Sequence, residues 1–306
     1  MSVLVVGSVA FDGIKSRFGE VDKVLGGSAT YFSLAASYFT DVRVIAVVGD
    51  DFTPENEEVF KRRKIDIRGI QRAQGSSFFW RGEYGDNPNE ANTLTTCLNV
   101  FEHFNPEIPA EYRDSNFLFL ANIDPVLQAN VRRQMADAAM VGGDTMNFWI
   151  NGKRQELGET LKLVDILLIN DSEVKALANE MILPRAARKV LAMGPKALVM
   201  KHGEYGATVF FRDGSLGGHH PFRAPTLPIE EVVDPTGAGD SFAGGFMGYI
   251  ASQGELNREV LKRAMFYGGV MGSFAVERFG PERLINLTRE EIDERFELFR
   301  ELTHLD

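Results

Sequence analysis

The sequence contains a single cysteine, Cys97, among its 306 residues, so no disulfide bond can form within the chain. A fold without disulfides fits a reducing compartment, and we expect a cytoplasmic protein. No apolar run approaches the roughly 20 residues that a helix needs to span a bilayer. The apolar N-terminal stretch lacks a basic flank and soon reaches Asp12, so it predicts a strand and not a signal peptide. We therefore expect no membrane partner.

Basic residues are also in deficit, because 33 Lys and Arg face 43 Asp and Glu and the formal net charge is −10. A non-specific nucleic-acid binder normally carries a basic face. The one basic run, residues 61–64, is typical of a solvated helix end. We expect no nucleic-acid partner, and we expect any bound anion to be held by a local device such as backbone amides.

Apolar residues make up 44% of the chain and gather in short continuous runs, which are typical of a parallel sheet buried on both faces. The predicted strands are residues 3–6, 42–48, 117–120, 164–169 and 197–200. The predicted helices are residues 29–39, 126–140, 172–180, 260–275 and 290–302. This alternation predicts a single α/β domain over residues 1–306 with a doubly wound, mostly parallel sheet flanked by helices.

Two segments depart from this alternation. Residues 72–104 contain two strand signals joined by a Gly/Asn/Pro-rich turn, and residues 13–25 add a short polar strand. We predict that they form a small β-sheet lid, inserted in the domain, that also mediates a homodimer; an edge extension of the main sheet is the alternative. The aromatic side chains of this segment either pack in a core or dimer contact or stack on a base or sugar, and Cys97 is expected to be a small apolar residue there: Phe78, Phe79, Trp80 and Tyr84.

The stretch DPTGAGDSFAGGF, residues 234–246, carries the strongest chemical signal. Pro235 ends a preceding strand, and Thr236 is expected to cap the helix that follows. The small residues 237–239 let several backbone N–H groups point the same way at the helix start, which predicts an anion site. Asp240 lies at the edge of this site, where it would repel an anion unless it faces a hydroxyl group that attacks phosphorus. The alternative is a Gly-rich helix start with Asp240 as a capping carboxylate.

Three other motifs fail to match. The Gly152-Lys153 pair lacks the hydroxyl residue of a Walker motif, and Phe242 replaces the third glycine of a dinucleotide-binding motif. A nucleophile elbow around Ser241 ends in Ala243 where glycine is required. A serine hydrolase using Ser241 is therefore the least favoured function.

Residues 234–246 closely resemble the C-terminal signature of the ribokinase-like (PfkB) family of sugar and nucleoside kinases, whose usual form is D-T-x-G-A-G-D. Three further stretches resemble family motifs in the same order: GGSA at 26–29, NDSE at 170–173 and KHGEYG at 201–206. The resemblance covers residues 1 to about 300. It implies a ribokinase-like fold and an ATP- and Mg²⁺-dependent kinase that phosphorylates a hydroxyl of a small sugar or nucleoside. A non-catalytic sugar, nucleoside or nucleotide sensor on the same fold is the alternative.

The resemblance also implies roles for single residues. Asp240 would be the catalytic base, and the amides of Gly237, Ala238 and Gly239 would hold the charge of the transferred phosphoryl group. Mg²⁺ would be held, through water, by Asn170 and Glu173. The residues implied to lie along the nucleotide are Asn170, Glu173, Lys201, Gly203, Gly206, Thr236, Gly237 and Gly239.

At the acceptor end, the resemblance implies that Asp12 binds acceptor hydroxyls and that Gly26 and Gly27 let the acceptor approach the backbone. Asp234 and Thr236 match positions that bind a monovalent cation, K⁺, in many relatives. The chain departs from the family at Tyr31, where an asparagine that touches the sugar is usual. Tyr31 is therefore a predicted acceptor-binding residue that puts simple ribose in doubt and favours a nucleoside.

Overall fold

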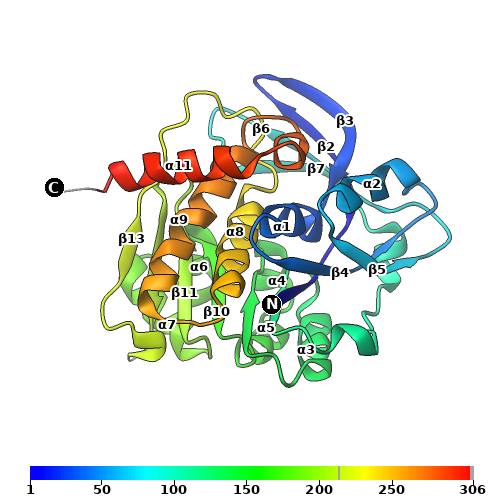
Figure 1. Ribbon diagram of the computed structural model, residues 1–306. Coiled ribbons are helices and arrows are strands. Elements are labelled where there is room, and N and C mark those ends of the chain that lie inside the picture. The colour runs from blue at the N-terminus through cyan, green and yellow to red at the C-terminus, as the bar shows by residue number, and fades with distance from the viewer. Residues whose placement is uncertain (213, 304–306) are drawn as a thin grey trace.

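The computed structural model describes residues 1–212 and 214–303, and its centre is a nine-stranded sheet (Figure 1). Neighbouring strands pair in parallel, except that β12 is antiparallel to both β11 and β13. The strand order is β13 (Phe222–Ala224), β12 (Ala207–Phe211), β11 (Ala197–Lys201), β10 (Ile166–Asn170), β9 (Met140–Gly143), β8 (Phe117–Leu120), β1 (Ser2–Val6), β4 (Asp41–Val48) and β5 (Asp66–Arg72). The predicted mostly parallel sheet is confirmed.

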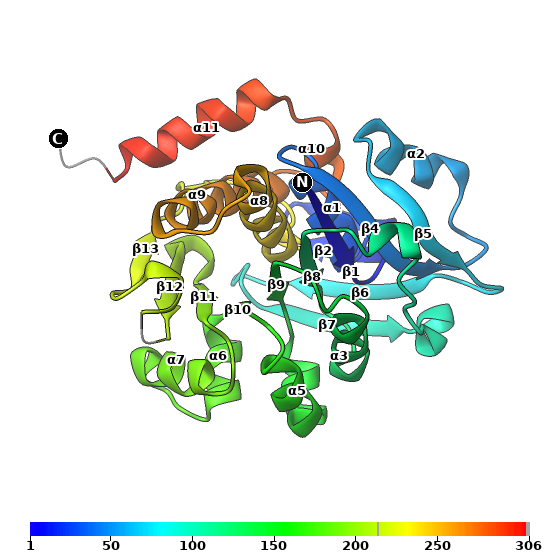
Figure 2. The ribbon, with the colours of Figure 1, turned by 60° about the horizontal axis from the view of Figure 1, so that its bottom comes forward.

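Strand β1 explains why this sheet must be covered on both sides. Val3 and Val5 pack into the core on one face, whereas Leu4 and Val6 pack into the core on the other face. A strand without a polar face is stable only between two layers of helices. Figure 2 shows these layers on either side of the sheet, and the doubly wound prediction is confirmed.

The first helical layer packs on the Val3 face, and α1 and α8 lie against each other within it. It contains α1 (Ser28–Ala36), α2 (Pro54–Arg62), α8 (Ala238–Gln253), α9 (Arg258–Ala275), α10 (Glu282–Ile285) and α11 (Arg289–Glu301). The second layer covers the opposite face and contains α3 (Pro125–Gln134), α4 (Asn147–Gly152), α5 (Arg154–Leu161), α6 (Asp171–Ala178) and α7 (Leu183–Ala192). None of the helices in the described part of the chain is long and apolar enough to cross a membrane.

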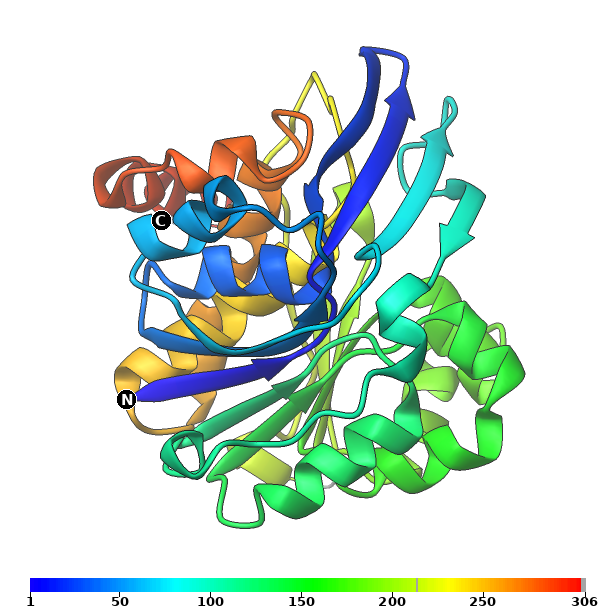
Figure 3. The same cartoon turned by 90° about the vertical axis from the view of Figure 1, so that its right-hand side faces the viewer.

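A separate four-stranded sheet, called the small sheet below, projects beyond the main sheet (Figure 3). Its order is β3 (Gly19–Gly26), β2 (Ala10–Ser16), β6 (Phe78–Tyr84) and β7 (Ala91–Cys97). Both predicted lid segments contribute to it, although residue 72 ends β5 of the main sheet and residues 99–103 form a short 3-10 helix. The alternative of an edge extension is wrong, because the two sheets are separate.

Three local predictions fail for physical reasons. No strand ends at Pro235, because residues 225–237 form a loop and turn between β13 and α8. The helix predicted over residues 126–140 ends at Gln134, and Met140 is a buried residue of β9, so the apolar spacing had merged a helix with the next strand. Cys97 is exposed, because β7 is an edge strand whose residues are all exposed. The sequence analysis also missed β12 and β13, which carry mixed and not continuous apolar runs.

Candidate active site

The predicted residues Asn170 and Lys201 stand at the carboxyl ends of neighbouring parallel strands. They are paired in the register of β10 and β11. Asp144 directly follows β9 at the same edge, since parallel strands end on one side of the sheet. In open α/β sheets this carboxyl edge is where ligands bind, so the candidate site lies here.

The start of α8 forms the next part of the site. Gly237 has φ +74° and stands at the N-cap without a side-chain capping bond, so Thr236 is not the predicted cap. The N–H of Ala238 donates to the Pro235 carbonyl, with 3.2 Å between nitrogen and oxygen. The N–H groups of Gly237, Gly239 and Asp240 have no acceptor among the described residues. They are free to hold an anion, whereas that of Ala238 is already bonded.

Asp234 organises the loop that leads into α8. Its side chain is fully buried, and its two oxygens accept the N–H groups of Thr236 and Gly280. In each bond 2.8 Å separates the nitrogen from the oxygen. The Thr236 hydroxyl is bonded to the hydroxyl of Tyr84, with 3.1 Å between the oxygens. These side chains therefore hold the loop, and each carboxylate oxygen of Asp234 keeps a lone pair, so the predicted ligation of a monovalent cation here stays a prediction.

A cationic side chain faces the anion site. The Nζ atom of Lys201 lies 3.5 Å from Asp144 Oδ2, and a Cβ added to Gly239 would lie 3.0 Å from the same Nζ. Burial alone would lower the pKa of Lys201, but Asp144, Glu173 and Asp240 outweigh it and raise the pKa. Lys201 therefore stays charged beside the free amides, where it adds to their attraction for a phosphate.

Three carboxyl groups surround Lys201. Burial raises the pKa of Asp240 to about 7, with a further rise from the charge of Asp144 and a partial offset by Lys201. Burial first, and then the charge of Asp144, also raise the pKa of Glu173 to about 7, and Lys201 again offsets part of this rise. Burial also raises the pKa of Asp144, although the charge of Lys201 lowers it in part. Such raised pKa values are typical of carboxyl groups that exchange protons near neutral pH. The position of residues 144–147 after a strand predicts polar contacts near the active site, and the structure places Asp144 beside Lys201.

Asn170 and Glu173 form a capping box at the start of α6. Asn170 Oδ1 accepts the Glu173 N–H, and Glu173 Oε2 accepts the Asn170 N–H. In each bond 2.8 Å separates the nitrogen from the oxygen. In the described part of the chain, no cluster of three or more His, Cys, Asp or Glu could hold a metal directly. Mg²⁺ in kinases is commonly held by one or two carboxylates, waters and substrate phosphates. The predicted binding through water fits this arrangement, because the carboxylate of Glu173 keeps one oxygen outside the capping box.

The acceptor end of the site is built from β2, β3 and α1. Asp12 is 4% exposed, and a Cβ on Gly26 would collide with its carboxyl group. Gly27 has φ +93°, and a Cβ there would collide with the Ser8 carbonyl. Burial first, and then the charges of Asp234 and Asp240, raise the pKa of Asp12 to about 8. Asp12 thus lies near enough to Asp234 and Asp240 for their charges to affect its pKa.

Tyr31 lies between the acceptor end and the anion site. Its side chain is 1% exposed, and its hydroxyl is buried without a hydrogen-bond partner among the described residues. A Cβ on Gly237 would collide with the Tyr31 ring, so the ring packs on the backbone of the anion loop. Burial raises the pKa of Tyr31, and Asp12 makes the largest contribution among the charges around it. An unpartnered buried hydroxyl is rare, and it is the group most ready to bond an acceptor.

Gly203 and Gly206 shape the turn after β11. They have φ +56° and +88°, and His202 N donates to the Gly206 carbonyl over 2.8 Å. A Cβ on Gly203 would collide with Asn89, which lies in the turn between β6 and β7 of the small sheet. The small sheet therefore contacts the candidate nucleotide site at two places: Asn89 lies against Gly203, and Tyr84 is bonded to Thr236.

Ser241 does not form a nucleophile. It is fully buried, and its hydroxyl donates to the Gly237 carbonyl over 2.7 Å. A hydrolytic serine needs an exposed hydroxyl bonded to a base. The hydrolase hypothesis is wrong for this residue.

A fold with free amides at a helix start, a lysine beside them and a carboxyl group at their edge is typical of phosphoryl-transfer enzymes. The family model of pfkB family carbohydrate kinases matches residues 2–286, and the chain belongs to this family. It is therefore a ribokinase-family kinase of carbohydrates or nucleosides, as the sequence resemblance implied.

Known relatives place the chain among kinases of small hydroxylated molecules. It is 28% identical to a cytidine kinase of Thermococcus kodakarensis over 284 residues, which cover 86% of this chain and 97% of that protein. It is 27% identical to an ATP-dependent ribose-1-phosphate kinase of Halopiger xanaduensis over 266 residues, 83% of this chain and 81% of the relative. The solved nucleoside kinase of Burkholderia thailandensis in complex with ADP-inosine has a TM-score of 0.80 at 20% identity, covering 99% of this chain and all of that one (100%).

Proposed function

We propose that this protein transfers the γ-phosphoryl group of ATP to a hydroxyl of a sugar or nucleoside, with Asp240 as the base. The observation that carries the proposal is the position of Asp240 at the start of α8, beside the free N–H groups of Gly237 and Gly239 and near Lys201. The pKa of Asp240, raised to about 7 by burial and by Asp144, matches a group that takes a proton at neutral pH.

The charge on the transferred group is held by the chain's own donors. The N–H groups of Gly237, Gly239 and Asp240 and the ammonium of Lys201 supply positive charge where the phosphoryl group passes. This set differs from the predicted one, since the Ala238 amide is bonded to Pro235 and the Asp240 amide is free. Phosphoryl transfer depends chiefly on such positioning and charge neutralisation.

Mg²⁺ bound with the nucleotide supplies further neutralisation of the phosphate charges, and Asn170 and Glu173 are the residues that would hold it through water. Glu173 is held in orientation by its capping box with Asn170. A K⁺ ion beside Asp234 and Thr236 remains part of the proposal, because the one hydrogen bond on each of their side-chain oxygens leaves acceptor capacity for it.

At the acceptor end, Asp12 and the Tyr31 hydroxyl bind acceptor hydroxyl groups. Both are buried, the Tyr31 ring packs on Gly237, and the Tyr31 hydroxyl has no partner among the described residues. A nucleoside is the favoured acceptor, because Tyr31 replaces the asparagine that usually touches the sugar and because relatives include kinases named for cytidine and nucleosides. The small sheet acts as the lid that excludes water from the site.

The edge of the small sheet supports the proposed homodimer. Every residue of β7 is exposed, and Leu94 on this edge strand is 48% exposed. An exposed edge with apolar residues favours pairing with a second copy. Sedimentation of the protein, with Leu94→Lys as the variant, tests it: dimers that persist unchanged in the variant remove this edge from the interface.

A product assay tests the function directly. Purified protein is incubated with ATP, Mg²⁺ and each member of a panel of nucleosides and sugars, and phosphorylated products are identified by mass spectrometry. The proposal expects at least one monophosphorylated acceptor, formed with one ADP per product. Tight acceptor binding without any phosphorylated product would instead support the non-catalytic sensor. The raised pKa of Asp240 and the charge of Lys201 near it do not favour that alternative.

A further inference from the structure

A second polar cavity lies at the opposite edge of the main sheet, away from Asp240. It has a volume of about 820 Å³ and lies where β10 and β11 begin, next to Asp165 and Lys196. Asn170 and Lys201 end the same two strands. Strands of five residues separate the two edges by about 15 Å, so this cavity is distinct from the candidate active site.

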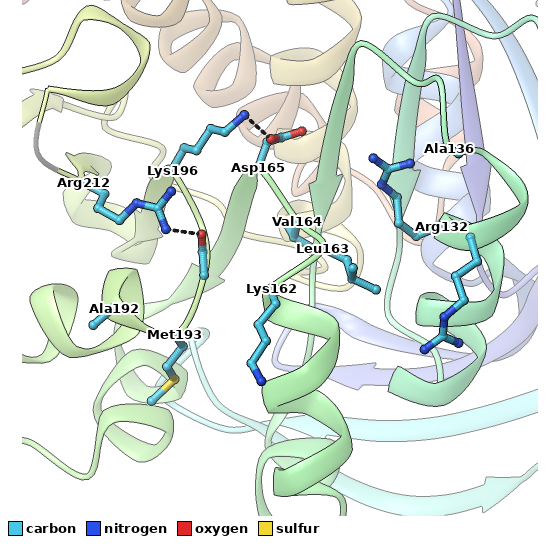
Figure 4. Close-up of a pocket in the computed structure, with 12 residues that line it drawn as sticks. Arg132, Ala136, Lys162, Leu163, Val164, Asp165, Ala192, Met193, Lys196 and Arg212 are labelled. Atoms are coloured by element: carbon cyan, nitrogen blue, oxygen red, sulfur yellow. Dashed lines mark hydrogen bonds and ion pairs between the residues drawn. The ribbon is translucent and has the colours of Figure 1, made fainter.

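The lining of this cavity is strongly basic in a protein whose formal net charge is −10. Its one described carboxylate, Asp165, is already used: Oδ1 pairs with Lys196 over 2.8 Å, and Oδ2 accepts the N–H of Val141 over 2.8 Å. Figure 4 shows Lys196 and Arg212 on one side of the cavity and Arg132 on the other. The cationic lining residues are Arg132, Arg133, Lys162, Lys196 and Arg212.

The three arginines of the lining have no carboxylate partner among the described residues, and Arg212 donates from Nη1 to the Gly194 carbonyl over a distance of 2.7 Å. Arg132 donates from Nη1 to the Met135 carbonyl over 2.5 Å, and Arg133 donates to Asn130 Oδ1 over 2.7 Å. The Nε atom of Arg132 is buried and has no hydrogen-bond partner in the described part of the chain. A buried donor left without an acceptor costs free energy, and it belongs to a side chain that lines the cavity.

Helix ends explain only part of this charge. Arg132 and Arg133 lie in the last turn of α3, and Lys162 follows α5, so they also neutralise the negative ends of these helices. Arg212 also serves a helix end, because its Nη1 donates to the Gly194 carbonyl just beyond α7, whereas Lys196 precedes β11 and pairs with Asp165. Charges from strands and helices thus converge on one cavity.

We propose that this cavity is a second binding site for a small metabolite with two or more phosphate groups. A single phosphate brings at most about two negative charges. Three cations, Arg132, Arg133 and Arg212, remain after Lys196 pairs with Asp165 and Lys162 pairs with Glu159. The described lining contains no aromatic side chain on which a base could stack. Recognition therefore rests on the phosphate groups, which arginine binds with paired N–H donors.

Calorimetric titration with inorganic tripolyphosphate tests this site. The titration is done at constant ionic strength, with the candidate active site filled by a non-hydrolysable ATP analogue and Mg²⁺. The variant Arg133→Gln/Arg212→Gln removes two cations from the cavity. The control variant Arg185→Gln/Arg188→Gln removes the same charge from exposed positions of α7 that do not line it.

We expect the wild-type protein to bind tripolyphosphate, the cavity variant to bind it about tenfold more weakly or worse, and the control to differ by less than about twofold. ATP and fructose 1,6-bisphosphate, titrated in the same way, distinguish a nucleotide from a sugar phosphate. Equal weakening in the two double variants, or no binding by the wild type, would overturn the proposal. If the double variant does not fold, as judged by circular dichroism, the exposed single variant Arg133→Gln replaces it, with Arg185→Gln as its control.

Discussion

Tyr84 of the small sheet and Thr236 of the loop before α8 are joined through their side chains, with 3.1 Å between the two hydroxyl oxygens. The bond connects segments 152 positions apart in the chain. Because Thr236 immediately precedes Gly237, the position of the small sheet and the conformation of the anion loop are physically linked. Closing of a lid and completion of the phosphate site would then be one event.

Tyr84→Phe tests this link. We expect a fall in kcat of about fivefold, the value of one hydrogen bond, and a larger fraction of ATP hydrolysed without transfer to the acceptor. The second effect follows because a looser lid admits water to the site. Both are measured from ADP and phosphorylated product in the same reaction.

Thr236→Val should produce the same change, and the double variant should be no worse than either single one, since they remove one bond. Tyr205→Phe, at a tyrosine that is 65% exposed, is the matched control. An unchanged ratio of hydrolysis to transfer in Tyr84→Phe would sink the proposed link.

Gly237 and Gly239 should respond differently to alanine. At Gly237, φ +74° and the Tyr31 ring both oppose a Cβ, so Gly237→Ala should lower the free energy of unfolding by about 1–3 kcal/mol. At Gly239 the backbone is helical and a Cβ meets only the flexible end of Lys201, so stability should change little while activity falls. Urea unfolding and initial rates measure the two effects, and equal losses of stability would contradict both the positive φ of Gly237 and its contact with the Tyr31 ring.

Tyr31→Phe should have opposite effects on stability and on binding. Removing a buried hydroxyl without a partner should raise the free energy of unfolding by about 1 kcal/mol. If this hydroxyl binds the acceptor, the same variant should raise KM for the acceptor while KM for ATP stays unchanged. Loss of stability together with an unchanged acceptor KM would show that Tyr31 is only a packing residue.

Stability should fall as pH rises from about 4 to about 8. Burial raises the folded-state pKa of Asp12 from 3.8 to about 8, so in this window the unfolded chain releases a proton that the folded chain keeps. The stabilisation is fully present below pH 4 and is lost as pH approaches 8. Asp12→Asn should flatten this dependence, as measured by urea unfolding at several pH values, and an unchanged slope would contradict the burial of an ionisable Asp12.

The sequence predicted most strands of the main sheet and the glycine loop before α8, because the signals for these elements lie within the elements themselves. The apolar runs of β1 and β8 and the glycines at 237 and 239 each report on their own neighbourhood. Contacts between distant segments left no such signal. Nothing near Tyr84 in the chain indicates Thr236, and nothing near Gly203 indicates Asn89.

The site residues show the same limit. Asp144 becomes part of the site only because β9 lies beside β10 and brings it to Lys201. The Ala238 amide looked free in sequence, but the turn at Pro235 uses it. Thr236 looked like a cap, but its hydroxyl is bonded to the small sheet. Side chains near a helix start compete for several partners, and only the folded chain decides among them.

Asp240→Asn tests the central claim most directly, because asparagine has nearly the same shape but cannot take the proton. The measurement is the single-turnover rate of phosphoryl transfer to an established acceptor, with ATP binding measured in parallel by calorimetry. The account predicts a loss of about a hundredfold or more in the transfer rate with ATP affinity within a few-fold of wild type. Transfer at a rate close to wild type would contradict it and remove Asp240 as the base.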